Sequence, residues 1–540
     1  MESSPRQRNF KKLAYAVAFL LLLSGTFAQC ASIVCDHDLW GHLKFGLDSL
    51  TSGQIPILHD LYSYTAYGHD WVNHEWLFEI LIAACYKAGG PLGLALLHVG
   101  LAEIFVCILF VSCRRTNQGV LPTLILPFLA LGAMWFYIRT LRPQLLTYIF
   151  LLMELDILAN YKSCYRLALM PLIFMLWVNC HGGFLIGLVL FTVWTLIELG
   201  VQLKQKQFKL SKLATWAWLV SLPASCLAIL VNPYGIKLIQ FLLQTATVPR
   251  TDITEWHPIV LTDTVGQIYL VCLGLIALAL RYKIRRASID SNTETEANFY
   301  CRMAILGIMS LSPLMAMRHM PLFVTAVFIT FSKELSAAFS SSRFSADLPW
   351  LDKFFRNIKQ RWQFVSLSLY CICGLLIAYA LSAAGLKDLQ SSTFIGGTAL
   401  ENPWRTIQLL KMSHAKGNLL ADFDWGEYCI WWLYPDWKVA IDGRRETVYD
   451  EAIYNSYLNF RHGLSSWNTL LIKYPTDAVL MRPYSAVCNL MKLEPGWQMI
   501  YADANSSLFV RKNSALAERL LKTKSILPPM PASAGEPQFP

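Results

Sequence analysis

The sequence predicts an α-helical polytopic membrane protein with a small C-terminal α/β domain. Of its 540 residues, 55% are hydrophobic and only 15% are charged, whereas a soluble domain carries about 25% charged residues. Eleven apolar windows are typical of membrane-spanning helices. Beyond residue 386 these windows stop, and short strand-like and helix-like segments alternate instead.

Composition and charge exclude several classes of protein. The apolar excess is incompatible with an ordinary soluble enzyme, a disordered chain or a collagen-like fibre. The net charge is +10, but the Lys and Arg residues lie in short loops between apolar windows. This pattern predicts a membrane topology and no nucleic-acid partner.

The first apolar run extends from Leu13 to about Val34 and follows four basic residues. Such a start resembles a signal sequence, with small residues near 28–31 at which cleavage is one alternative. The run is also long enough to span a bilayer, so we expect an uncleaved first helix.

The remaining windows predict spans in the order of the chain. A shorter apolar stretch, Trp76–Ala88, ends at Gly89, Gly90 and Pro91, and its length predicts an interfacial or re-entrant helix. The eleven predicted spans are 13–33, 91–112, 119–138, 143–160, 166–181, 183–203, 212–232, 266–281, 301–317, 320–334 and 363–386.

The distribution of basic residues predicts the orientation. Loops on the same side as the N-terminus carry 23 Lys and Arg residues, and the opposite loops carry 7. The positive-inside rule therefore predicts a cytoplasmic N-terminus, and an odd number of spans places the C-terminal region outside the cytoplasm. The predicted domains are a membrane domain over 1–386 with its first outer loop at 34–90, an extracytoplasmic α/β domain over 387–525, and a disordered tail over 526–540.

The C-terminal region alternates between two kinds of short segment. The strand-like segments are 418–421, 438–441, 477–481, 499–501 and 508–511. The helix-like segments are 426–433, 447–460, 466–474 and 485–493. This alternation predicts a small α/β fold.

Unusual polar residues gather on the predicted outer side of the membrane. Alone, each has an ordinary explanation, because aromatic and His side chains favour membrane interfaces and Arg side chains extend to head groups. Together they come from six separate pieces of chain and predict one site. The candidate residues are Asp36, His37, Asp38, His42, His74, Glu75, Arg142, His181, His257, Arg318 and His319.

The pair Asp36 and Asp38 is the most informative of these candidates. Two acids this close to each other beside a bilayer repel, and they need a cation, a proton or an Arg partner. The pair is accordingly the place where the sequence predicts ligands for a divalent cation, Mg²⁺ or Mn²⁺. His74 and Glu75 do not indicate a zinc protease, because a second His one helical turn away is missing.

These features resemble the GT-C superfamily of glycosyltransferases, which take sugars from polyprenyl-phosphate carriers. The likeness lies in an Asp-x-Asp after the first span, a long outer loop with an interfacial helix, many spans and the C-terminal α/β region. From Asp36 to Arg511, the strings Asp-His-Asp-Leu-Trp-Gly-His-Leu, Tyr-Ser-Tyr-Thr, Trp-Val-Asn-His-Glu-Trp-Leu-Phe-Glu, Asn-Pro-Tyr-Gly and Ile-Asp-Gly-Arg resemble a bacterial group of GT-C-like membrane proteins. The resemblance implies a bacterial inner (plasma) membrane protein in which Asp36 or Asp38 is a base or metal ligand.

The sequence therefore favours a membrane glycosyltransferase that moves a sugar from a polyprenyl-phosphate carrier to an extracytoplasmic acceptor. One carboxylate of the Asp36/Asp38 pair takes the acceptor's hydroxyl proton, and the other orients the acceptor or holds the cation. Arg142 and Arg318 are assigned to the departing lipid phosphate, because guanidinium groups bind phosphate in a bidentate manner. The histidines and Glu75 complete the pocket.

Two other functions stay open at this level. A transporter or flippase of a lipid-linked substrate would place polar residues near the bilayer midplane, where this sequence has few acids. A non-catalytic scaffold would bind a partner protein through its outer domain, with the turn at 442–445 as the binding element. The sugar and the acceptor, whether glycan, lipid or protein, are not specified by the sequence.

Overall fold

The computed structural model describes residues 5–528 except 33, 117–119, 160–163, 210–212, 246, 247, 249, 251, 288–295, 341–364, 392–394 and 397–401. The chain divides into two compact units. Unit 1 comprises residues 1–32 and 95–392, and unit 2 comprises residues 33–94 and 393–540. From residue 529 onward, the predicted disordered tail lies outside the described residues.

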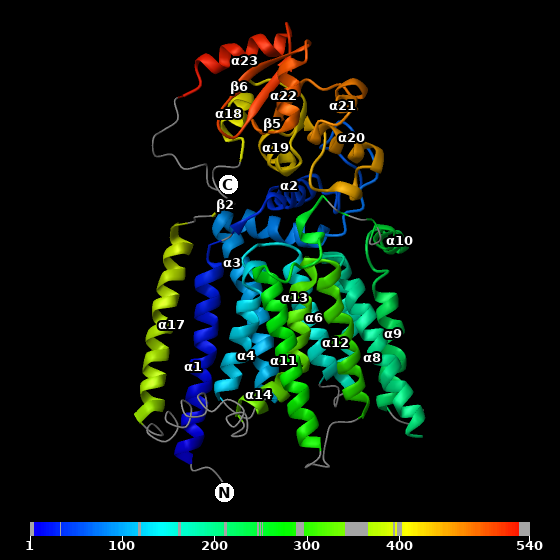
Figure 1. Ribbon diagram of the computed structural model, residues 1–540, viewed down its shortest axis with the longest axis vertical. Helices are drawn as coiled ribbons and strands as arrows, with labels where there is room; N and C mark the ends of the chain where they lie inside the picture. The colour runs from blue at the N-terminus through cyan, green and yellow to red at the C-terminus, as the bar shows by residue number, and fades with distance from the viewer. Residues whose placement is uncertain are drawn as a thin grey trace. The chain divides into compact units, whose positions relative to one another are not determined.

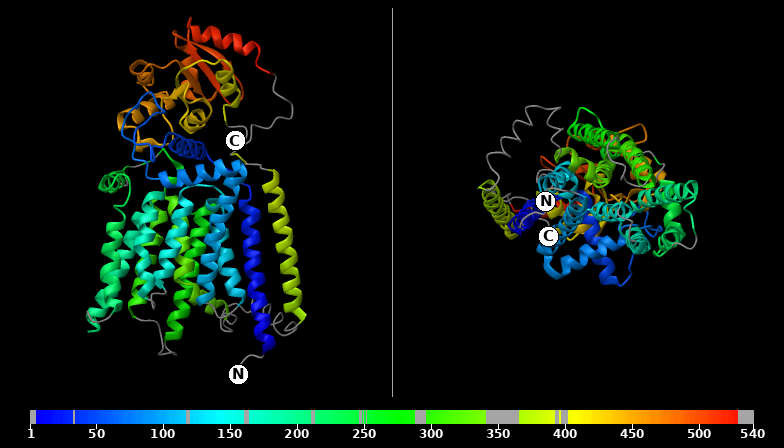
Figure 2. Two further views of the ribbon diagram at one scale, coloured as in Figure 1. Left: turned by 180° about the vertical axis from the view of Figure 1, so that it is seen from behind. Right: turned by 90° about the horizontal axis from the view of Figure 1, so that it is seen from below.

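Unit 1 consists of helices that run largely side by side (Figures 1 and 2). Each of the eleven apolar windows of the sequence contains a helix of the structure. The helices are α1 (Pro5–Cys30), the second part of α3 (Trp76–Thr116), α4 (Val120–Ala133), α5 (Trp135–Ile138), α6 (Gln144–Ala159), α7 (Met170–Cys180), α8 (Phe184–Lys204), α9 (Leu213–Ala228), α10 (Ile236–Thr245), α11 (Thr264–Ala287), α12 (Glu296–Met315), α13 (Met320–Thr330), α14 (Ser332–Ser340) and α17 (Val365–Ser391).

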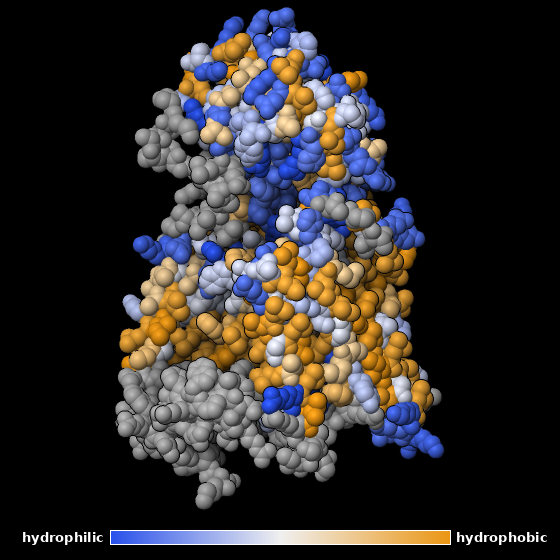
Figure 3. Space-filling view, in the orientation of Figure 1, coloured by the Kyte–Doolittle hydropathy of each residue, from blue (hydrophilic) through white to orange (hydrophobic). Residues whose placement is uncertain are grey.

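The helices of unit 1 have the character of membrane helices. Among the residues that the structure describes, five helical segments are long and apolar enough to cross a bilayer, namely Lys12–Cys30, Trp76–Arg115, Phe184–Lys204, Thr264–Ile284 and Ile372–Leu389. On the face drawn in Figure 3, apolar side chains cover most of the helical unit. Such a large exposed apolar surface is typical of helices that face lipid. The count of eleven crossings stays a prediction.

Helices α1 and α17 pack along each other although they lie far apart in the sequence. Two glycines of α17 permit the close approach. A Cβ atom at Gly374 would lie 2.5 Å from Val17 Cγ1, and one at Gly385 would lie 2.6 Å from Phe27 Cδ1. Small residues at such crossings let two apolar helices approach closely enough for van der Waals contact between their backbones and side chains.

Helix α3 bends where the sequence predicts the end of an interfacial helix. Gly90 has φ 58° and ψ −144° inside the helix, and Pro91 follows it. The positive φ suits glycine, and proline has no N–H to continue the hydrogen-bond ladder. Trp76–Gly89 and the following apolar segment are therefore two helices joined at a kink.

Unit 2 is built on a mixed five-stranded sheet with strand order β4-β3-β5-β7-β6. β3 (Gly417–Ala421), β4 (Trp437–Val439) and β5 (Ala478–Met481) are parallel, whereas β7 (Ser507–Arg511) is antiparallel to β5 and to β6 (Trp497–Ala502). The strand-like segments of the sequence coincide with these strands to within two residues. The accompanying helices are α18 (Trp404–Met412), α19 (Gly426–Leu433), α20 (Glu451–His462), α21 (Thr469–Lys473), α22 (Ala486–Leu493) and α23 (Ala515–Ser525).

The first outer loop belongs to unit 2, which differs from its predicted place in the membrane domain. It contains a helix that the sequence analysis did not identify, α2 (His37–Ser52). Its segment 62–64 pairs with the outer edge of β4, where Tyr64 N donates to Val439 O at 3.0 Å and Val439 N donates to Tyr62 O at 3.1 Å. The physical reason is that an edge strand left unpaired exposes backbone donors and acceptors.

Candidate functional site

The two acids of the Asp-x-Asp motif lie at the start of α2. Asp36 is the N-cap, because its Oδ1 accepts a hydrogen bond of 2.9 Å from the backbone N–H of Leu39. His37 is the first residue of the helix, and Asp38 lies in its first turn. The positive end of the helix dipole favours both carboxylates there. Asp36 thus has a structural role, and Asp38 is the stronger candidate for proton transfer.

A third carboxyl group, Glu427, lies beside Asp38 within unit 2. Its side chain is buried at the start of α19, and its Oε2 accepts a hydrogen bond of 3.2 Å from Gly41 N. A Cβ atom built at Gly443 would lie 2.7 Å from Glu427 Oε1 and 3.2 Å from Asp38 Oδ1. Both carboxyl groups therefore pack against Gly443, where a larger side chain would collide with them.

Burial raises the pKa of Glu427 well above its ordinary value, and the charge of Asp38 raises it further. A carboxyl group with a raised pKa beside another carboxyl is a pattern found where protons are exchanged. Glu427 is not among the predicted site residues, because it is separated from Gly41 of α2 by 386 positions in the sequence. The signal that pointed to this region was the Ile-Asp-Gly-Arg string, which contains Gly443.

Three more candidates meet where α2 packs against the start of α3. His42 Nδ1 lies 3.1 Å from Glu79 Oε1, and His42 Nε2 lies 3.8 Å from Glu75 Oε2. His74 lies 3.8 Å from the other oxygen of Glu75. Asn73 donates a hydrogen bond of 2.6 Å to Glu79 Oε2, which orients that carboxylate toward His42. The imidazole of His42 is thus held between two acids.

The surroundings of His42 predict a pH-dependent stability. Burial lowers its pKa, but the hydrogen bond to Glu79 and the charges of Glu75, Glu79 and Glu427 outweigh burial and raise the pKa to about 10. Because this value is above the ordinary one near 6.5, the protonated ring stabilises the fold fully below about pH 6.5. This contribution is lost as the pH rises through about 10.

We therefore expect the unfolding temperature of the wild type to fall more steeply between about pH 8 and pH 11 than that of His42→Gln, which does not titrate. Thermal unfolding of the detergent-purified proteins, followed by tryptophan fluorescence, measures both curves. Parallel curves would show that His42 is not held as a cation.

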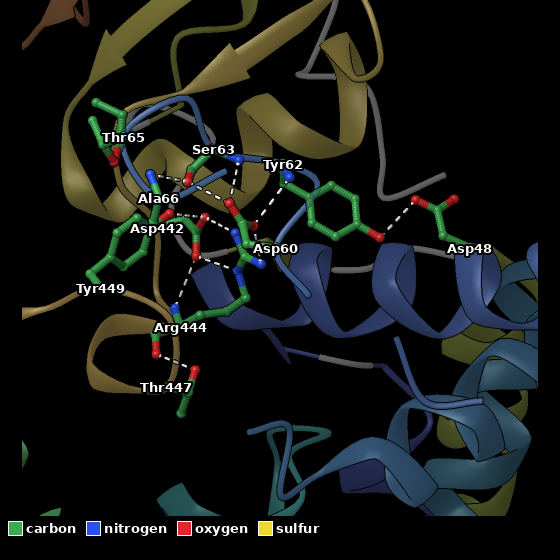
Figure 4. Close-up of polar contacts among 11 residues, drawn as sticks. Asp48, Asp60, Tyr62, Ser63, Thr65, Ala66, Asp442, Arg444, Thr447 and Tyr449 are labelled. Carbon is green, nitrogen blue, oxygen red and sulfur yellow. Dashed lines mark hydrogen bonds and ion pairs between the residues drawn. The ribbon is translucent and has the colours of Figure 1, made fainter. Parts of the chain in front are cut away.

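A buried ion network joins the first outer loop to the turn after β4 (Figure 4). Arg444 lies 2.7 Å from Asp60 Oδ1 and 2.7 Å from Asp442 Oδ2, and Tyr449 donates a hydrogen bond of 2.6 Å to Asp442. The Arg444 guanidinium also contacts aromatic rings of the loop, including Tyr62 at 5.1 Å. Since Asp442 and Arg444 are buried, they hold unit 2 together and do not offer the binding turn that a scaffold would use.

In unit 1, two predicted arginines meet at one carboxylate. Arg142 Nη1 lies 3.3 Å from Glu255 Oε2, and Arg318 Nη1 lies 3.6 Å from Glu255 Oε1. Arg142 lies two residues before α6, Glu255 precedes α11, and Arg318 lies between α12 and α13. These connections are at the same end of the helical unit. That this end faces the outside of the cell stays a prediction.

The predicted histidines of unit 1 have different surroundings. His181 ends α7, and its Nδ1 lies 2.8 Å from Thr147 Oγ1 and accepts from Gly183 N at 3.0 Å. His319 Nδ1 lies 3.0 Å from Ser312 O. His257 is exposed, and its backbone oxygen accepts a hydrogen bond of 2.8 Å from Met317 N. Of the three, His257 has the most accessible side chain.

The candidates thus form two groups, one in each unit. Asp38, His42, His74 and Glu75 gather in unit 2 with Glu427, whereas Arg142 and Arg318 gather in unit 1 with Glu255. That these groups serve one site stays a prediction. The metal site at Asp36 and Asp38 also stays a prediction, since among the described residues no group of three or more His, Cys, Asp or Glu side chains is arranged to hold an ion.

No model of a protein family matches the chain, and no curated protein matches it in sequence. The structure is similar to ArnT from Cupriavidus metallidurans bound to undecaprenyl phosphate, with 10% identity, 96% of this chain and 99% of that chain covered, and a TM-score of 0.47.

It is also similar to arabinofuranosyltransferase AftD from Mycobacteria, with 14% identity, a TM-score of 0.47, and coverage of 94% of this chain but 40% of AftD. At such low identity, the chemistry has to be argued from this chain's own residues.

Proposed function

We propose that the chain is a membrane glycosyltransferase that moves a sugar from a polyprenyl-phosphate carrier to an extracytoplasmic acceptor. The observation that supports this proposal most is the convergence of Arg142 and Arg318 at one end of an apolar helical unit. Guanidinium groups bind phosphate oxygens, and apolar helices accommodate an isoprenoid tail. The second support is the pair of carboxyl groups, Asp38 and Glu427, which both pack against Gly443.

The proposed reaction assigns each group one task. The acceptor's hydroxyl oxygen forms a bond to the anomeric carbon, and the bond from that carbon to the phosphate oxygen breaks. The phosphate leaves with the bonding electrons and is bound by Arg142 and Arg318. Asp38 takes the hydroxyl proton as general base. The anomeric carbon passes through an oxocarbenium-like state, as in glycoside hydrolysis.

A divalent cation, Mg²⁺ or Mn²⁺, is compatible with these residues only in part. Mg²⁺ is often held by one or two carboxylates together with substrate phosphates and waters. Asp36 and Asp38 would supply the carboxylates. One oxygen of Asp36, however, caps α2. The ion would stabilise the phosphate charge. The other tasks do not need the ion, because Asp38 takes the proton and the two arginines bind the phosphate.

Binding of undecaprenyl phosphate by the purified protein tests the proposal. We expect Arg318→Gln and Arg142→Gln each to weaken binding by about tenfold or more, because a hydrogen bond to a charged group contributes about 1.5–3 kcal/mol. Arg115→Gln is the control, since Arg115 pairs with Asp156 at 2.9 Å instead. Equal binding by the wild type and both variants would contradict the proposed function.

We further propose that the chain lies in a bacterial inner membrane with a cytoplasmic N-terminus and an extracytoplasmic unit 2. The charge asymmetry of the loops supports this orientation. Reporter fusions after Arg286 and after Lys512 are expected to report opposite compartments. Identical compartments would exclude the eleven-span topology.

A further inference from the structure

Three connections of unit 1 bring an anionic and several cationic side chains together. Glu255 and Trp256 belong to the short 3-10 helix Thr254–Trp256, and Arg318 belongs to the 3-10 helix Met317–His319. Met317 N donates to His257 O at 2.8 Å, and Tyr137 OH donates to Met317 O at 3.4 Å. Hydrogen bonds outside the ion pairs thus hold the two short helices in place.

Glu255 lies between the two arginines, at distances longer than those of ordinary charge-assisted hydrogen bonds. Its two oxygens contact different guanidinium groups, at 3.3 Å from Arg142 and 3.6 Å from Arg318. Charge-assisted N–H···O bonds are ordinarily about 2.7–2.9 Å long. The side chains of Arg142, Arg318 and Glu255 are 28%, 22% and 39% exposed, so a ligand in solution or in the membrane interface reaches them. The carboxylate is thus a weakly held anion.

An aromatic ring fixes the cationic side of this cluster. The guanidinium carbons of Arg250 and Arg318 lie 4.0 Å and 4.3 Å from the centroid of the Trp256 ring. Stacking on tryptophan is the most favourable cation–π arrangement. Arg318 therefore keeps its position when its ion pair with Glu255 opens, which is what an exchangeable anion site requires.

We propose that Glu255 is a resting counter-ion, and that the phosphate of a polyprenyl phosphate displaces it from Arg142 and Arg318. This inference rests on the proposed function and adds the residue that sets the affinity of its phosphate site. A sugar-linked phosphodiester carries one negative charge, whereas the released phosphomonoester carries up to two. Glu255 competes better against the singly charged group, so the arginines engage most strongly as charge develops on the leaving phosphate.

The test is the affinity of the full-length protein for undecaprenyl phosphate, measured by native mass spectrometry or a fluorescence titration in detergent. Glu255→Gln removes the competing carboxylate and is expected to tighten binding by about three- to tenfold. The ligand then no longer has to break two partly exposed ion pairs, each of which contributes little. Glu255→Ala is expected to do the same if Gln disturbs the fold. Asp263→Asn is the matched control, because this exposed acid lies in the same connection and loses the same charge.

A second pair of variants tests the tryptophan. Trp256→Leu is expected to weaken binding, and Trp256→Phe is expected to restore most of it, because a phenyl ring keeps the cation–π contact. Inorganic phosphate is titrated in parallel. Tighter binding of undecaprenyl phosphate alone supports a lipid ligand, whereas an equal gain for inorganic phosphate overturns that assignment.

The possible failures are distinguishable. If Arg142→Gln and Arg318→Gln lose binding but Glu255→Gln and Glu255→Ala bind no more tightly than the wild type, the counter-ion inference is wrong and the proposed function stands. If the arginine variants bind like the wild type, the proposed function itself fails.

Discussion

Asp38→Asn is expected to lower sugar transfer from a polyprenyl donor by about 10²- to 10⁴-fold, the usual loss when a general base is removed. Asparagine has nearly the same size but cannot accept the acceptor's proton. Asp38 lies in the first turn of α2, and its Oδ1 packs against Gly443 beside the carboxyl group of Glu427. Expression, membrane insertion and unfolding temperature are expected to stay close to those of the wild type. Transfer is measured with the purified protein and a radiolabelled lipid-linked sugar.

Two further variants make this result interpretable. Asp36→Asn keeps an N-cap, because Asn caps helices as well as Asp does, so a loss of transfer there reports the lost charge. Asp70→Asn is the silent control, since the Asp70 side chain is 85% exposed and its partner at 3.1 Å, His59, is 60% exposed. Asp48 is less suitable, because it accepts hydrogen bonds from Tyr62 and Lys44. Full activity in the double Asp36→Asn, Asp38→Asn variant would disprove the catalytic role.

Apolar windows and turn residues were sufficient to predict most helices and strands. The bend of α3 at Gly90 and Pro91 follows from local backbone chemistry. The strands of unit 2 follow from short apolar segments between polar turns. Such features depend on neighbouring residues, which is why they are readable from the sequence.

Helix α2 was missed for a physical reason. It contains Gly41 and Gly46, which lower helix propensity. The structure shows why glycine stands there, because a Cβ at Gly46 would lie 2.1 Å from Glu79 O and one at Gly41 would lie 2.2 Å from Glu427 Oε2. The helix depends on packing against partners distant in the sequence. No local pattern reports such a requirement.

The same limit applies to the candidate site. His42 and Glu75 both belong to the predicted first outer loop, and the structure places them 3.8 Å apart. Glu427 and Glu255 were missed, because each becomes a candidate only through its contact with residues distant in the sequence. Their partners were among the predicted site residues: Asp38 lies beside Glu427, and the two arginines lie beside Glu255.

Arg444→Met is expected to destabilise the protein by about 3–5 kcal/mol, the usual cost of removing one partner from a buried ion pair. The loss leaves Asp60 and Asp442, both 0% exposed, as two buried acids without their shared cation. It also removes the guanidinium from contact with the rings of Phe45, Tyr62 and Trp71. Thermal unfolding in detergent, followed by tryptophan fluorescence, measures the fall in unfolding temperature.

Lys416→Met is the matched control for this variant. Lys416 lies 2.9 Å from Asp436, but the two side chains are 78% and 50% exposed, and a surface pair of this kind contributes at most about 1 kcal/mol. Adding Asp442→Asn to Arg444→Met is expected to recover part of the loss, because one of the two unpaired charges is then removed. A fall no larger than that of Lys416→Met would show that Arg444 does not join the first outer loop to the sheet.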